Sequence, residues 1–143
     1  MADIYTAALM EHNAHPDYRY VMDAPTHTRE GVNPSCGDAL ELALRIEDGT
    51  IAEAAFTGHG CAVSQASADI MADLIEGEPV EAARHRCELF LSMIRGDALD
   101  QAQLAALGEA AELASIARMP ARVKCAELAW RTLEALLDES EAS

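Results

Sequence analysis

The chain has 143 residues, half of them hydrophobic, and a formal net charge of −15. An acidic surface repels nucleic-acid phosphates and anionic lipid headgroups, so neither nucleic acid nor a membrane is an expected partner. No stretch approaches the roughly 20 apolar residues that span a bilayer, and the N-terminus lacks the basic region of a secretion signal. We therefore expect a cytoplasmic protein, in which reducing conditions keep the four cysteines as free thiols.

The N-terminal part begins with a predicted helix. Asp3 is a suitable cap for a helix that runs to about Ala14, because the following His15-Pro16 pair disfavours helical backbone. Residues 16–35 are polar and irregular, with room for one short edge strand before Asn33-Pro34.

Residues 39–57 show the pattern of a β-hairpin. Hydrophobic residues alternate with polar ones in its first half, which predicts a strand with one buried face, carried by Leu40, Leu42, Leu44 and Ile46. Asp48-Gly49 is a strong tight-turn pair, and Ile51–Thr57 forms the second strand. Gly58–Cys61 is predicted to be a flexible turn.

The rest of the chain has helical spacing. We expect helices at 62–76, from Pro79 to about Gly96, within 98–118 as one or two short segments, and from Pro120 to about Asp138. A helix, a small antiparallel sheet and then helices predict an α+β fold. The length predicts a single domain over residues 1–143, with 139–143 as a frayed tail.

Three cysteines and one aspartate form a candidate metal site. Cys36 and Asp38 precede the hairpin and Cys61 follows it, so the closing of the hairpin should bring these three residues together. Cys125 lies on the last predicted helix, at the edge of its apolar side. Three thiolates and one carboxylate would fill the four positions of a zinc tetrahedron. His59 is an alternative to Asp38 as the fourth ligand.

The fourth cysteine has a different setting. Cys87 belongs to a helical apolar stripe with Ala83, Phe90 and Ile94, which indicates a core residue. The chain has no CxxC pair, P-loop, GxSxG motif or zinc-protease histidine spacing.

Three segments, taken together, resemble a known family. Residues 33–38, 58–68 and 122–130 are similar to the iron–sulfur scaffold family of IscU and the N-terminal part of NifU, and most closely to its SufU branch. Lys124 stands where the scaffold branch has a histidine. The 64-residue step from Cys61 to Cys125 leaves room, around residues 95–118, for the extra segment of SufU-like chains.

The resemblance implies a small three-stranded antiparallel sheet packed by helices. It implies one zinc ion per chain, held by Cys36, Asp38, Cys61 and Cys125. It further implies that Cys36 accepts persulfide sulfur from a pyridoxal-phosphate-dependent cysteine desulfurase and passes it toward a separate iron–sulfur scaffold complex. Two other functions are compatible with these residues: a scaffold on which a [2Fe–2S] cluster is assembled, and a structural zinc domain that binds a partner without chemistry.

Overall fold

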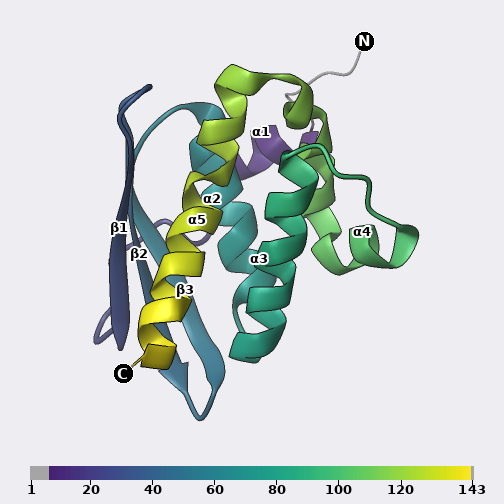
Figure 1. Cartoon of the computed structure of the whole chain (residues 1–143). Coiled ribbons are helices and arrows are strands. Elements are labelled where there is room, and N and C mark those ends of the chain that lie inside the picture. Colours follow the sequence, from purple (N-terminus) through teal and green to yellow (C-terminus); the bar gives the residue numbers. More distant parts are fainter. Residues whose placement is uncertain (1–6, 143) are drawn as a thin grey trace.

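The computed structural model describes residues 7–142, without the side chain of residue 142 (Figure 1). In chain order the elements are α1 (Ala7–Ala14), β1 (His27–Asn33), β2 (Asp38–Glu47), β3 (Thr50–His59), α2 (Ala62–Ile75), α3 (Val80–Ile94), α4 (Gln101–Leu107), the 3₁₀ helix η1 (Gly108–Arg118) and α5 (Pro120–Ala142).

The three strands form one antiparallel sheet in the order β1-β2-β3. Asp48 and Gly49 both have positive φ, of 51° and 76°, as the favoured two-residue hairpin turn requires. The alternating hydrophobic residues of β2 face the helices, and Leu42 and Leu44 are fully buried. The predicted fold class, with its hairpin and its short edge strand, is confirmed.

The helices cover one face of the sheet (Figure 1). α2 packs against β3 and α5 packs against β1, while α3 lies against α5. The rings of Phe90 and Trp130 stack between α3 and α5 with centroids 4.1 Å apart. Large aliphatic and aromatic side chains therefore fill the space between the sheet and the helices.

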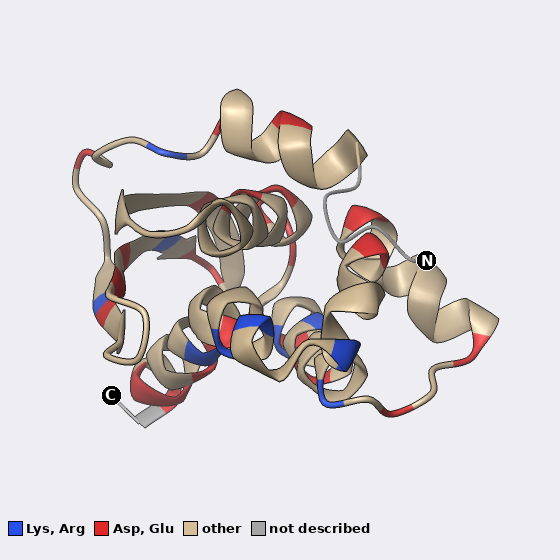
Figure 2. Cartoon of the chain, turned by 90° about the horizontal axis from the view of Figure 1, so that it is seen from above, with Lys and Arg blue, Asp and Glu red and all other residues tan. Residues whose placement is uncertain are grey.

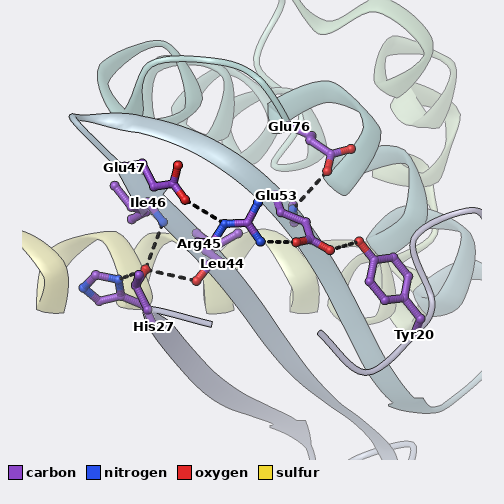
Figure 3. A network of polar contacts seen from close by, with 10 residues as sticks. Tyr20, His27, Leu44, Arg45, Ile46, Glu47, Glu53 and Glu76 are labelled. Atoms are coloured by element: carbon purple, nitrogen blue, oxygen red, sulfur yellow. Dashed lines mark hydrogen bonds and ion pairs between the residues drawn. The ribbon is translucent and has the colours of Figure 1, made fainter. Parts of the chain in front are cut away.

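The segment between α1 and β1 crosses the other face of the sheet. Met22 is buried there against Ala43 and Ala55. Figure 3 shows how polar contacts hold this segment, because the Tyr20 hydroxyl donates to Glu53, which also pairs with Arg45. The hairpin is thus packed on both faces where Ala43 pairs with Ala55.

Three local expectations need correction or fall outside the structure. Gly58 and His59 belong to β3, because they pair with Leu40 and Ala39, so the turn expected from Gly58 is wrong for these two residues. The expected helix end at Asp138 is wrong, because α5 continues to Ala142. Asp3, the expected first cap, lies outside the described residues. Across residues 7–142, no helix is both long and apolar enough to cross a membrane.

Candidate metal centre

Cys36 lies in the connection between β1 and β2, and Asp38 begins β2 directly after it. This connection is at the upper end of the sheet in Figure 1. Asn33 pairs with Asp38 across this connection. The amides of Cys36 and Gly37 donate to the Asn33 carbonyl at 3.3 and 3.0 Å, and Gly37 adopts φ = 74°. The tight turn leaves Cys36 exposed and places Asp38, 1% exposed, on the first residue of β2.

Cys61 reaches the same place from the start of α2. It is the N-cap residue of that helix, and its amide donates to Oδ1 of Asp38 at 2.9 Å. Its Sγ lies 3.9 Å from Oδ2 of Asp38. A Cβ on Gly60 would lie 2.6 Å from Oδ1 of Asp38, so the close approach requires glycine at this position.

Cys125 completes the group from α5. It is 1% exposed, and its Sγ lies 3.4 Å from Sγ of Cys36. The Sγ of Cys36 in turn lies 2.9 Å from Oδ2 of Asp38. One ligand atom from each of Cys36, Asp38 and Cys125 falls within 4.8 Å of the others. The closing of the hairpin and the packing of α5 thus bring Cys36, Asp38 and Cys125 together, and Cys61 adjoins this group through Asp38.

Burial and hydrogen bonding give the Asp38 carboxyl and the Cys125 thiol opposite charge preferences. Burial alone would raise the pKa of Asp38, but hydrogen bonds from the thiol of Cys36 and the amide of Cys61 lower it below its usual value. Burial, followed by hydrogen bonding to Cys36 and Cys61, raises the pKa of the Cys125 thiol. Asp38 is therefore a carboxylate at neutral pH, whereas Cys125 keeps its proton unless a cation replaces it.

The segment that leads into Cys125 is unusually basic for this chain. Acidic residues are spread along much of the chain (Figure 2). Residues 113–126, however, contain Arg118, Arg122 and Lys124 and no acidic residue. The charge of Arg122 contributes to the lowered pKa of Asp38, so it favours a negatively charged donor set.

The donor atoms of Cys36, Asp38 and Cys125 lie close enough to one another to share a zinc ion. A tetrahedral site with Zn–S of 2.3 Å has S···S edges of about 3.8 Å and S···O edges of about 3.5 Å. The Cys36–Cys125 sulfur distance of 3.4 Å is shorter than the ideal edge, and the sulfur–oxygen distances of 2.9 and 3.9 Å lie on either side of theirs. Cys36, Asp38, Cys61 and Cys125 would hold the ion, and its positive charge would keep the thiols deprotonated.

The alternative ligand and the fourth cysteine lie elsewhere. His59 is exposed and stands opposite Ala39. Paired residues share one face of a sheet and neighbours along a strand alternate, so the register places His59 on the face opposite to Asp38. Cys87 is 2% exposed and donates to the Trp130 carbonyl at 3.2 Å. Burial raises the pKa of Cys87 to about 12, which is consistent with an unreactive core thiol.

Asn33 is a contact that the sequence interpretation did not assign. Its Nδ2 donates to Sγ of Cys36 at 2.9 Å, and its Oδ1 accepts from the amide of Ser35 at 3.2 Å. The signal was present in the sequence, since asparagine before a proline often folds back on the backbone two residues later. That pattern predicts a turn but says nothing about which side chain the free amide group will meet.

A small α+β fold that gathers cysteines and an aspartate at one end of its sheet defines a protein with a candidate thiolate-rich metal site. The family described as the NifU-like N-terminal domain matches residues 4–126. The chain belongs to this family, as the resemblance predicted.

Individual relatives cover nearly the whole chain. The iron–sulfur cluster assembly scaffold protein IscU of Thermotoga maritima is 39% identical over 134 residues, which is 94% of this chain and 92% of the relative. The zinc-dependent sulfurtransferase SufU of Bacillus subtilis is 32% identical over 131 residues, 92% of this chain and 87% of the relative.

Solved structures agree with the fold. A crystal structure described as a putative iron–sulfur cluster assembly scaffold protein for the SUF system, from Fervidobacterium islandicum, superposes with a TM-score of 0.87 at 31% identity. It covers 94% of this chain and 96% of the other. The N-terminal part of a NifU-like protein from Brucella abortus has a TM-score of 0.85 at 18% identity, with 98% and 96% of the two chains covered, which supports the fold alone.

Proposed function

We propose that this chain is a zinc-dependent sulfurtransferase of iron–sulfur cluster assembly. Cys36 accepts sulfur from the persulfide of a pyridoxal-phosphate-dependent cysteine desulfurase and relays it toward a separate scaffold complex. The observation that carries this proposal is the unequal exposure of the site thiols. Cys36 is exposed at the tip of the β1–β2 connection, Cys61 is half-buried and Cys125 is buried. A sulfur donor on another protein can therefore reach Cys36 first.

The transfer is a thiol–disulfide-type exchange. The thiolate of Cys36 attacks the terminal sulfur of the donor persulfide, a new S–S bond forms on Cys36, and the donor's S–S bond breaks. The donor cysteine leaves as a thiolate, so atoms and charge balance and no external oxidant is needed. The same exchange then passes the terminal sulfur to the next acceptor.

The other three residues hold the site. Asp38 accepts from the Cys61 amide and contacts the Cys36 sulfur, so it connects the β1–β2 loop to the start of α2. Cys61 and Cys125 belong to helices that are packed into the core, which limits their movement. Cys36 lies on a four-residue loop and is the site cysteine with most freedom to move.

The zinc site and the sulfur transfer are supported by the SufU relative, whose name states both properties. A [2Fe–2S] scaffold is the second candidate, because the relatives from Thermotoga maritima and Streptococcus pyogenes are named as scaffold proteins. Lys124 favours the first candidate. This residue precedes the third cysteine, where the scaffold branch carries a potential histidine ligand, and lysine is not among the usual protein ligands of zinc or iron–sulfur clusters.

Metal content and desulfurase turnover separate the candidates. The chain is purified without added metal, its zinc and iron are measured, and alanine release by a cysteine desulfurase is followed with and without it. We expect about one zinc per chain and faster alanine release. Cys36→Ser should abolish the stimulation, and Cys87→Ser should preserve it, because a serine hydroxyl can still donate to Trp130. Iron-containing brown protein would favour the scaffold, and zinc without stimulation would favour a structural domain.

A further inference from the structure

Among the described residues, the Cys36 sulfur has one hydrogen-bond partner that is not a metal-donor atom. Asp38 and Cys125 approach it with a carboxylate oxygen and a sulfur, whereas Asn33 approaches it with an amide N–H at 2.9 Å. An amide nitrogen has no lone pair available for a metal, so this contact serves the sulfur itself. Among the described residues, Cys36 is the one site cysteine whose sulfur accepts a hydrogen bond from an N–H group.

The orientation of the Asn33 amide is fixed by a second hydrogen bond. The Ser35 amide needs an acceptor, and Oδ1 of Asn33 provides it at 3.2 Å. The amide oxygen must face this N–H, so the NH₂ group must face the sulfur. Asn33 is itself only 6% exposed at the end of β1, and its backbone is paired with Asp38. The donor is therefore held rigidly from the sheet rather than from the loop.

We propose that Asn33 is a positioning residue for sulfur acceptance. Its N–H holds the Cys36 sulfur at the exposed tip of the loop, in line for a donor persulfide, and keeps a hydrogen bond to the sulfur while the new S–S bond forms. The observed contact thus fixes where the sulfur lies, because its donor is held by the sheet. This inference rests on the proposed function and adds to it the residue that holds the exposed Cys36 sulfur in place.

Two variants separate the donor from the other roles of Asn33. Asn33→Asp keeps an oxygen that can accept from the Ser35 amide and removes the N–H donor, but adds a charge. Asn33→Ala removes the donor without adding a charge. Both preserve the backbone carbonyl that accepts from Cys36 and Gly37. A defect shared by the two variants is therefore caused by the missing donor. Asn13→Asp and Asn13→Ala, on the exposed side of α1, are matched controls.

Two readouts test the proposal. With a cysteine desulfurase and cysteine, we expect kcat for persulfide formation to fall roughly 10-fold or more in both Asn33 variants, while KM for this chain stays within about two-fold. In chelator-treated protein, iodoacetamide should alkylate the Cys36 peptide several-fold more slowly than in the wild type, with the Cys61 peptide unchanged. Melting temperature and zinc content are measured beside these rates.

The outcomes are distinct. Wild-type rates on Cys36 in either folded Asn33 variant would overturn the positioning role, and so would failure of both variants to fold, which would make Asn33 a structural residue. If the wild type itself receives no persulfide, the proposed function fails. In that case the ratio of the Cys36 alkylation rates in the Asn33 variants and the wild type still shows whether Asn33 orients the Cys36 sulfur.

Discussion

Asp38 is the residue whose replacement tests the metal site most sharply. Its Oδ1 accepts the amide of Cys61 and its Oδ2 contacts the sulfur of Cys36, with the side chain buried. Asp38→Asn keeps an oxygen for the Cys61 amide but exchanges a carboxylate ligand for a weaker one. Asp38→Ala removes both functions. The pair of variants therefore separates the contribution to the fold from the contribution to zinc binding.

The magnitudes follow from these contacts. In zinc-free protein, Asp38→Ala leaves the Cys61 amide without its acceptor, which costs about 1–3 kcal/mol. For a chain of this size that lowers the melting temperature by roughly 3–10 °C. Asp38→Asn keeps the acceptor and should cost less than about 1 kcal/mol. In both variants we expect zinc affinity to fall by at least roughly 10–100-fold, which is the loss seen even for residues that only support a ligand.

The assay is competition for zinc with a chromogenic chelator, combined with thermal melts of zinc-loaded and zinc-free protein. His59→Ala is the control, since His59 is exposed on the opposite face of the sheet. We expect this control to keep its zinc. Loss of zinc from His59→Ala together with full retention in Asp38→Asn would refute the assignment of the fourth ligand.

Three further predictions concern other residues. Cys87→Ala should keep zinc and sulfur transfer and lose about 1–2 kcal/mol of stability in denaturant melts, because a buried sulfur and its hydrogen bond are removed; loss of transfer in the folded variant would contradict the core assignment. Gly60→Ala should release zinc in the chelator assay, since its Cβ would displace Asp38, and unchanged affinity would show that the backbone adapts. Burial lowers the pKa of His12, but the hydrogen bonds and charges of Asp69 and Glu109 outweigh burial. The pKa of His12 is therefore raised above its ordinary value of 6.5. The stability that these His12 contacts contribute is fully present below pH 6.5, and it is lost as the pH rises through the pKa of His12 in the folded protein. The stability difference between the wild type and His12→Gln should therefore shrink from pH 6 to pH 9, and a constant difference would exclude this linkage.

The hairpin and its consequence for the site were predictable from the sequence. Alternation of Leu40, Leu42 and Leu44 specifies the buried face, and Asp48-Gly49 specifies the turn. A closed hairpin necessarily brings its two flanks together, so the proximity of Cys36, Asp38 and Cys61 followed from topology. Helical periodicity likewise placed Cys125 on the inner side of α5.

The missed features depend on partners that are distant in sequence. β3 continues through Gly58 and His59 because β2 supplies their pairing. α5 continues beyond Asp138, where Glu139 pairs with Arg29 and Glu141 pairs with Arg84, and neither arginine is near in the chain. The contact between Asn33 and the Cys36 sulfur depends on the exact course of the loop. The helix and strand propensities of neighbouring residues cannot predict such contacts between residues that are distant in sequence, nor the exact course of a loop.

Acceptance of sulfur by Cys36 is the central claim, and peptide mass spectrometry tests it most directly. The zinc-loaded chain is mixed with a cysteine desulfurase and cysteine, free persulfides are alkylated, and each cysteine peptide is examined. We predict an added sulfur, about 32 Da, on the Cys36 peptide, and none on any cysteine peptide of the folded Cys36→Ser variant. Persulfide found only on Cys61 or Cys125, or full transfer by Cys36→Ser, would contradict the account.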